Sequence, residues 1–259
     1  MSSRWLLGIA IFMIGLAYGH PSAARSLAAV KDTGTLGLCA HPNSLPFASK
    51  DGKRHGFQVD LAKALAERLG VSLSEDWIIS RYDLFRANCD IVMDSIADRQ
   101  AQEDSGLSLS RPYRRSGVAL TVRAGDHRIA KLDDITKAMK VGVLSGSIVS
   151  MKLTQRGIET TPSLFEDEVL DMLDAKEIDA AAVTPTSAGY YNLTHPGHKL
   201  RVIYAFDNEP DLTWNVAVGM RRPDDALREA IDKAMAEMMS DGTIKRVYAS
   251  YGIEFQPPR

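Results

Sequence analysis

Several polar side chains of this 259-residue chain follow short apolar runs and have the chemistry to bind a small molecule. Asp94 comes after the buried strand predicted at 90–93, where its carboxylate could accept hydrogen bonds from a cationic or hydroxylated ligand or instead cap the next turn. Arg99 could clamp an anion, or pair on the surface with Asp98 or Glu103. These residues indicate a binding site rather than a reaction centre.

Two further segments place hydroxyl groups at the expected starts of helices. Ser145 and Ser147 flank Gly146, and the free N–H groups of a helix start attract anionic or carbonyl oxygen, although Ser147 can equally serve as a plain N-cap. Thr184, before Pro185, could bind a ligand or only shape the turn. We expect the acidic run 166–168 to be solvated charge at a helix start.

The turn after the first strand adds a hydroxyl and an aromatic ring. Ser44 and Phe47 lie in it, and Phe47 either packs beneath the turn or forms a wall of the site. Ser95, beside Asp94, completes the predicted ligand-binding set. His41 has no His or carboxylate at ligand spacing, so we assign no metal site, and no nucleophile–base pair appears. We therefore predict no catalytic residues and no cofactor.

Strand and helix patterns alternate along the chain that must position these groups. Apolar runs predict strands at 36–40, 71–77, 90–93, 117–123, 140–144, 178–183, 200–206 and 215–220. Helical periodicity predicts helices at 58–69, 81–87, 165–175, 187–192, 224–239 and 243–251, and another that ends at Gln155. This alternation predicts an α/β fold of doubly wound lobes, with crossings between them near 118–123 and 214–220.

The first 24 residues have the pattern of a signal peptide. Arg4 precedes an apolar run from Trp5 to Leu16, and Ser22 and Ala24 suit a cleavage site. The run is shorter than the roughly 20 residues that a spanning helix needs. We expect an exported mature chain in a bacterial periplasm, not embedded in the membrane, and a monomer.

Charge and cysteine content limit the possible partners. The net charge of −2 with scattered Lys and Arg argues against nucleic acid. Cys39 and Cys89 are an even pair, so a disulfide is expected in an oxidising compartment; parallel neighbouring strands, however, could hold their Cα atoms beyond the roughly 7 Å bridging limit. Two thiols without clustered His cannot form a structural zinc site.

Seven groups of residues in order resemble bacterial extracellular solute-binding proteins of the two-lobed type II periplasmic fold, which include amino-acid receptors of ABC transporters. The groups are 41–47, 56–61, 89–93, 111–113, 141–147, 178–182, and 241–244 with 251–253. The resemblance implies lobe I at 28–120 plus 218–253, lobe II at 121–217, and a hinge that closes on a ligand. A narrower likeness, in 39–47, 89–93 and 111–116, is to periplasmic proteins associated with quinoprotein methanol dehydrogenases.

Three positions depart from the amino-acid receptors that the chain resembles. Ser44 stands in place of an aromatic residue, Gln102 in place of the carboxylate-binding Arg, and Thr184 in place of the ammonium-binding Asp. A zwitterion without its charge partners would lose several kcal/mol per buried ion, so we do not expect an ordinary α-amino acid as ligand.

Three functions remain open from the sequence. The first is a receptor that delivers a small polar ligand to an ABC transporter permease. The second is an accessory protein of a periplasmic quinoprotein dehydrogenase, whose cleft holds a partner's segment. The third, a periplasmic dehydratase, would depend on Asp94 or His41 as the only candidate acids, and we place it last.

Overall fold

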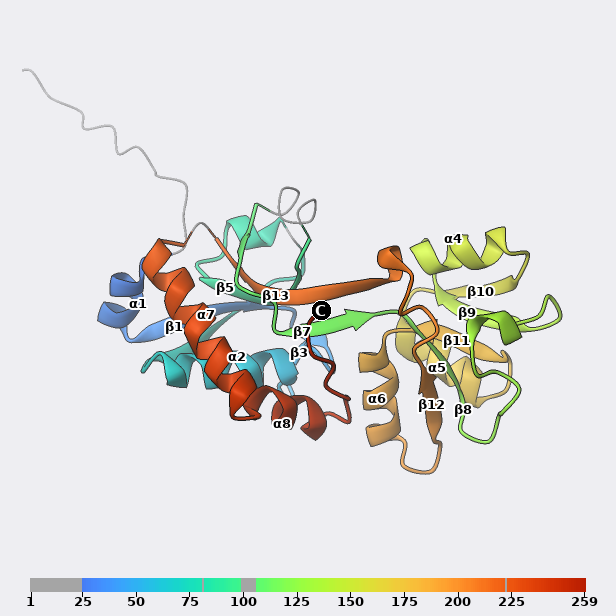
Figure 1. Ribbon diagram of the computed structural model, residues 1–259. Coiled ribbons are helices and arrows are strands. Elements are labelled where there is room, and N and C mark those ends of the chain that lie inside the picture. The colour runs from blue at the N-terminus through green and yellow to red at the C-terminus, as the bar shows by residue number, and fades with distance from the viewer. Residues whose placement is uncertain (1–24, 81, 99–105, 222) are drawn as a thin grey trace, which may run out of the picture.

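The computed structural model describes residues 25–80, 82–98, 106–221 and 223–259, and it contains two separate sheets (Figure 1). The first sheet has the order β4-β1-β5-β13-β6, and β7 also pairs with β13. Its strands are β1 Thr35–Ala40, β4 Ser72–Trp77, β5 Ile91–Ile96, β6 Ser108–Leu109, β7 Arg114–Gly117 and β13 Thr213–Met220. A small ribbon of β2 Asn43–Ser44 and β3 Ala48–Ser49 lies beside it.

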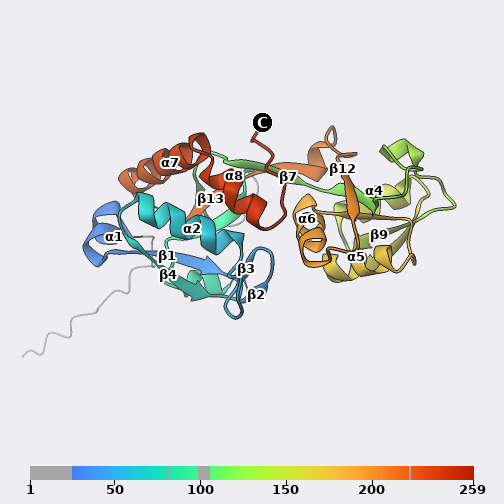
Figure 2. The ribbon, with the colours of Figure 1, turned by 90° about the horizontal axis from the view of Figure 1, so that it is seen from below.

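The second sheet has the order β10-β9-β11-β8-β12. Its strands are β8 Ala119–Arg123, β9 Lys140–Leu144, β10 Glu159–Ser163, β11 Ala180–Val183 and β12 Leu200–Ile203. Helices α4 Ile148–Gln155, α5 Glu166–Asp174 and α6 Pro185–Thr194 accompany it, with short 3-10 turns at Leu132–Asp134 and Pro210–Leu212. The first sheet has helices α1 Leu27–Thr33, α2 Phe57–Arg68, α7 Asp225–Ser240 and α8 Thr243–Ser250, and a 3-10 turn at Asp83–Phe85. Figure 2 shows the two groups side by side.

Each sheet has its own hydrophobic core. Leu38, Phe57 and Ile91 are fully buried in a cluster that joins the first sheet to its helices. A second cluster contains Val141 and Val143 of β9, buried against their own helices. Separate cores of this kind are what allow two lobes to move as units.

The carboxyl ends of the parallel strands in both sheets point toward the connection between the sheets. In the first sheet, Ile96 at the end of β5 pairs with Val216 of the antiparallel strand β13, whose first residue Thr213 pairs with Gly117. In the second sheet, Val183 at the end of β11 pairs with Ala119, which follows Gly117 by two positions. Since β1 and β4 run parallel to β5, and β9 and β10 parallel to β11, two sets of strand ends face each other.

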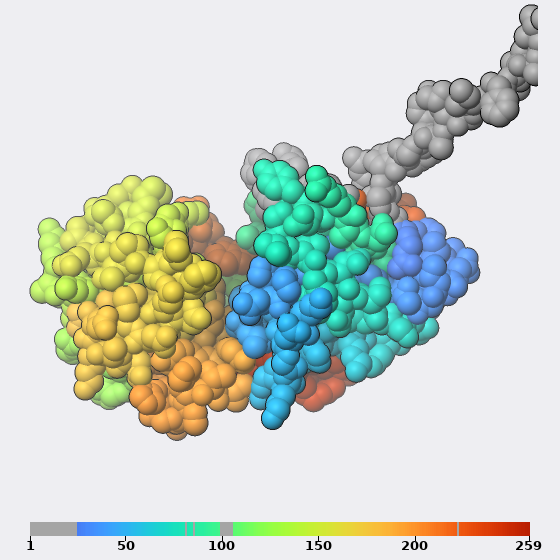
Figure 3. Space-filling model, turned by 180° about the vertical axis from the view of Figure 1, so that it is seen from behind, coloured from blue at the N-terminus to red at the C-terminus, as the bar shows by residue number. Residues whose placement is uncertain are grey.

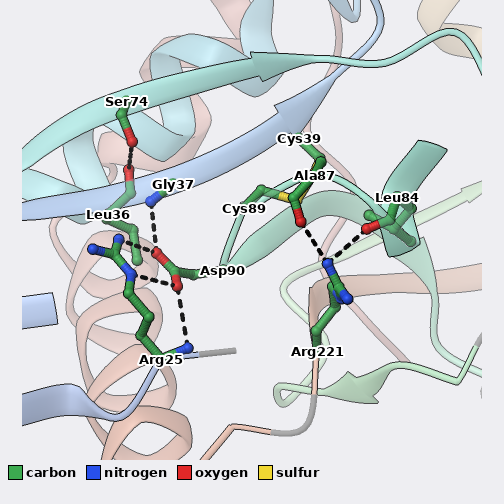
Figure 4. The surroundings of a disulfide bond; sticks show 10 residues. All are labelled: Arg25, Leu36, Gly37, Cys39, Ser74, Leu84, Ala87, Cys89, Asp90 and Arg221. Atoms are coloured by element: carbon green, nitrogen blue, oxygen red, sulfur yellow. Dashed lines mark hydrogen bonds and ion pairs between the residues drawn. A yellow bond between two sulfur atoms is a disulfide. The ribbon is translucent and has the colours of Figure 1, made fainter. Parts of the chain in front are cut away.

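The N-terminal part of the described chain is fixed to the first sheet (Figure 4). Asp90, which is buried, accepts a hydrogen bond from the backbone N–H of Gly37 at 2.7 Å and forms an ion pair with Arg25 at 2.6 Å. Cys39 and Cys89 form a disulfide with a Cα–Cα distance of 5.3 Å. Cys89 immediately precedes the loop residue before β5, the neighbour of β1, and the distance is below the roughly 7 Å bridging limit.

Some elements differ from those predicted. Strand β10 and helix α1 were not expected, and β10 carries Pro162, which is tolerated in an edge strand. The strand predicted at 90–93 extends to Ile96. Asp94 consequently lies inside a strand rather than after one.

Candidate functional site

Asp94 adopts a left-handed backbone conformation within β5, with φ of 53°. Its Oδ1 accepts hydrogen bonds from the hydroxyls of Tyr113 at 2.7 Å and Tyr248 at 3.0 Å, and its Oδ2 accepts one from Gln58 at 3.3 Å. Non-glycine residues in this region are uncommon and gather at functional sites. The carboxylate therefore faces two tyrosines instead of capping the next turn.

Both tyrosines are almost completely buried and act as fixed donors to Asp94. Burial raises the pKa of Tyr113 and of Tyr248 well above the ordinary value, and the nearby Asp94 carboxylate raises each further. Their hydroxyls therefore stay protonated at any physiological pH. The negative charge of Asp94 is held by neutral donors, which leaves it able to accept further hydrogen bonds.

Arg114 of β7 connects the first sheet to helix α6 of the second half. Its side chain is buried, its guanidinium lies over the ring of Tyr248, and its Nη2 donates to Thr186 Oγ1 of α6 at 2.8 Å. Its Nε has no hydrogen-bond partner among the described residues. Asp94, Tyr248, Arg114 and Thr186 thus form one polar chain from the first sheet to the second.

Thr184 binds a carboxylate that the sequence did not indicate. Its N–H donates to Glu166 Oε1 at 2.8 Å and its hydroxyl to Glu166 Oε2 at 2.7 Å, while the same hydroxyl accepts the N–H of Ser187 as the N-cap of α6. Glu166 is half-buried, so the expectation that this residue is only solvated charge is wrong. Thr184 directly follows the end of β11, and Glu166 is the first residue of α5. These two positions, a strand end and a helix start, are the one signal in the sequence that could have suggested the contact.

Ser145 and Ser147 lie at the carboxyl end of β9. Ser147 is the N-cap of α4: its hydroxyl accepts the N–H of Ser150 at 3.3 Å and donates to the carbonyl of Leu144 at 2.7 Å. Ser145 is exposed, and its N–H donates to the carbonyl of Ser163 at 2.8 Å. Of these two hydroxyls, that of Ser147 serves the helix, and that of Ser145 is exposed at the strand end.

The residues predicted in lobe I do not all face the same way. Phe47 is half-buried and packs on Phe57, with ring centroids 5.3 Å apart, and its N–H donates to the carbonyl of Ser44. Ser95 lies against β13, since a Cβ placed on Gly219 would come within 2.4 Å of the Ser95 hydroxyl. Ser95 therefore faces a neighbouring strand. Arg99 and Gln102 lie outside the described residues.

The predicted residues form two groups on facing edges of the two sheets. Ser44, Phe47 and Asp94 lie on the first edge, and Ser145, Ser147 and Thr184 on the second. Figure 3 shows a hollow between the two halves, with blue residues of the first and yellow residues of the second on its sides. A cavity of about 530 Å³ lies near the hinge, lined from both halves by residues such as Ala97, Trp214 and Asp207.

Comparisons with known proteins define the class of this chain. Residues 36–254 match the model of the bacterial extracellular solute-binding proteins, family 3, and the chain belongs to that family. The two-lobed α/β architecture with a hinge is that of the type II periplasmic binding proteins.

Particular relatives share most of the chain. It is 26% identical over 252 residues to a histidine-binding periplasmic protein of Escherichia coli K12, covering 93% of this chain and 95% of the relative. An ancestral cationic amino acid solute-binding protein has a similar structure, with a TM-score of 0.74, 22% identity, and coverage of 87% and 99%. The periplasmic binding protein XoxJ from Methylobacterium extorquens AM1 has a TM-score of 0.66, 23% identity, and coverage of 85% and 98%.

Within the described ranges, no helix is both long and apolar enough to cross a bilayer. In that same part of the chain, no three His, Cys, Asp or Glu residues come together as candidate metal ligands.

Proposed function

We propose that this solute-binding protein works in the periplasm, where it captures a small polar ligand between its lobes and presents it to an ABC transporter permease. One observation carries the proposal: two sets of strand ends face each other across a two-strand connection. Ligands of open α/β sheets bind at such strand ends. Relatives of the same family that carry binding-protein names span nearly the whole chain.

The lobes proposed from the sequence are residues 28–120 plus 218–253 and residues 121–217, after removal of a signal peptide at 1–24. Residues 213–217 of β13 pair in the first sheet and residues 119–120 of β8 in the second, so both crossings lie slightly earlier in the chain than these bounds. The hinge is the pair of crossings near Gly117 and Thr213, which are paired in the first sheet. Closure by rotation about these crossings would bring Asp94 toward Thr184. We keep Ser44, Phe47, Ser145, Ser147 and Arg99 as additional ligand-contacting residues of this proposal.

The proposed site is tested by ligand-induced stabilisation. Metabolites that co-purify with the native protein are identified by mass spectrometry, and each is added back in a thermal unfolding assay. The variant combining Asp94→Asn with Thr184→Val should lose the ligand-dependent rise in Tm. Unchanged affinity in a variant with native circular dichroism would reject the assignment of these two residues.

A second candidate is an accessory protein of a quinoprotein alcohol or methanol dehydrogenase. It is favoured by the likeness of residues 39–47, 89–93 and 111–116 to proteins of that kind and by the structural similarity to XoxJ. Co-purification of a dehydrogenase, with no small molecule that raises Tm, would favour it over the transporter function. We propose no catalytic step for this site.

A further inference from the structure

Exposed hydrophobic side chains gather on the two facing edges. Ten large hydrophobic residues are exposed in the described part of the chain, and eight of them lie at the carboxyl end of a strand that points toward the hinge or in the loop or first helix turns that follow it. The eight are Leu45, Ile79, Tyr82 and Ile96 in the first half and Ile148, Met151, Leu164 and Phe165 in the second. The other two, Leu193 and Met239, lie on α6 and α7.

The apolar residues follow the strand order outward from the hinge. In the first sheet this order is β5, β1 and β4. Ile96 ends β5, Leu45 lies in the turn between β2 and β3 that follows β1, and Ile79 and Tyr82 follow β4. In the second sheet the order is β11, β9 and β10. The end of β9 leads into Ile148 and Met151, and the end of β10 into Leu164 and Phe165. The segments that follow the middle and outer strands of both sheets therefore carry exposed apolar residues.

Four of these side chains are very open: Ile79 is 78% exposed, Tyr82 77%, Leu164 76% and Phe165 61%. Leu45, Ile96, Ile148 and Met151 are 41–55% exposed, closer to the 39% and 36% of Leu193 and Met239. Single exposed apolar residues are normal, but a concentration of them in one region marks a binding surface. Two opposed apolar walls can both contact one guest that lies between them.

The inner strands supply polar groups that accept hydrogen bonds. On β5 the carboxylate of Asp94 is held by neutral donors, and beside β11 the carboxylate of Glu166 is held by Thr184. A carboxylate has about four lone-pair positions, so each of these groups can take one more donor. A guest that reaches the hinge therefore meets acceptors there and apolar surface farther out.

We infer that the cleft binds a small molecule with an apolar body and a head that donates hydrogen bonds, such as an amine or an alcohol. This inference rests on the proposed function and names the substrate class of the same site. A small guest fits better than a protein surface because the apolar residues are divided between the facing edges of the two halves. Outside those edges, the exposed large hydrophobic residues of the described chain are single.

Straight-chain amines are suitable probes. Butylamine, hexylamine and octylamine are titrated against the full protein below their aggregation concentrations, and Kd is measured by calorimetry. Each methylene group buried between the walls should tighten binding about fourfold. Histidine serves as the zwitterionic comparison, and we expect it to bind more weakly than hexylamine.

Variants of the walls make the test specific. Ile148→Ser and Leu164→Ser should each weaken hexylamine binding about tenfold or more, whereas the matched controls Leu193→Ser and Met239→Ser should leave it unchanged. All four side chains are exposed, so the unliganded protein should keep its Tm. Equal losses in wall and control variants would show nonspecific binding and reject the inference.

Two further outcomes separate the inference from the function on which it rests. If histidine or another amino acid raises Tm and none of the alkylamines binds, the apolar substrate class is wrong and the solute-binding function stands. If neither amines nor co-purified metabolites bind, but a periplasmic protein does, both proposals fail.

Discussion

Arg114 lies over the ring of Tyr248, with its guanidinium carbon 4.4 Å from the ring centroid. Arg114 belongs to β7 of the first sheet, and its Nη2 also reaches Thr186 on α6 of the second half. A planar guanidinium can stack on a ring and direct a hydrogen bond at once, which an ammonium group cannot do. This contact therefore links the two halves next to the hinge.

Arg114→Lys should lower the free energy of unfolding by about 2 kcal/mol, because a buried ammonium loses the stacking on Tyr248 without gaining a carboxylate partner. Urea unfolding followed by circular dichroism measures the change. Arg228→Lys, on the exposed pair with Asp225, is the matched control and should change the free energy by less than about 0.5 kcal/mol. Equal effects of the two substitutions would contradict a structural role for the stacked guanidinium.

Removal of the disulfide should destabilise the protein by about 4 kcal/mol at most, because the bond closes a loop between residues separated by 50 positions. The variant combining Cys39→Ala with Cys89→Ala, and the reduced wild type, are compared with the oxidised protein in urea. Reductant should leave the double variant unchanged. A wild-type midpoint that does not respond to reductant would show that this bond does not stabilise the fold.

Gly56→Ala should destabilise the fold much more than Gly52→Ala. Gly56 has φ of 94°, and a Cβ there would lie 2.3 Å from the carbonyl oxygen of Phe47. Gly52 also has a positive φ, of 106°, but a Cβ there would meet nothing within 4 Å. Strain of this kind costs about 1–3 kcal/mol. Both variants share the cost of the positive φ, so the difference between them measures the cost of the steric clash at Gly56. Equal losses in thermal unfolding would mean that the loop moves to accommodate the methyl group.

Asp126 should make stability depend on acid pH. The hydrogen bonds of Arg128 lower the pKa of Asp126 to about 2, below the ordinary aspartate value of 3.8. Because the pKa is lower in the folded state, this stabilisation is present above about pH 4 and is lost as pH falls toward 2. Asp126→Asn should therefore be less stable than wild type at pH 6 and differ less at pH 2.

The control for Asp126→Asn is Asp133→Asn, which removes one exposed carboxylate. Unfolding midpoints in urea are compared at pH 6, 4 and 2, a range over which an ordinary aspartate changes from ionised to protonated. If the difference between Asp126→Asn and wild type stayed constant across this range, the ion pair with Arg128 would not contribute.

Local patterns predicted much of the fold because they act over a few residues. The alternation of apolar strands with amphipathic helices indicated two α/β lobes, and the strand at 140–144 begins and ends as expected. Strand β10, which pairs with β9, was not predicted because it contains Pro162 and three hydroxylated residues instead of an apolar run. Its edge position depends on a neighbour elsewhere in the chain, which local propensity does not encode.

The contacts within the site were harder to predict from the sequence because they join residues that are far apart in the chain. Thr184 was placed correctly at a strand end, but its carboxylate partner Glu166 lies 18 positions away. The partners of Asp94 are more remote still, since Tyr248 lies 154 positions from it. Residue type and local position can nominate such groups, but only the tertiary fold shows which hydrogen bonds already occupy them.

The anchoring of Arg25 limits where the preceding segment can be cut. The Arg25 guanidinium binds both carboxylate oxygens of Asp90 and the carbonyl of Thr35. A peptidase acting after Ala24 would leave this residue as the new amino terminus with its contacts intact. Removal of Arg25 as well would leave the buried carboxylate of Asp90 without its ion-pair partner, which would lower the stability of the fold by several kcal/mol. If the signal peptide proposed at 1–24 is removed, intact-mass measurement of the mature protein would locate the cut to the residue.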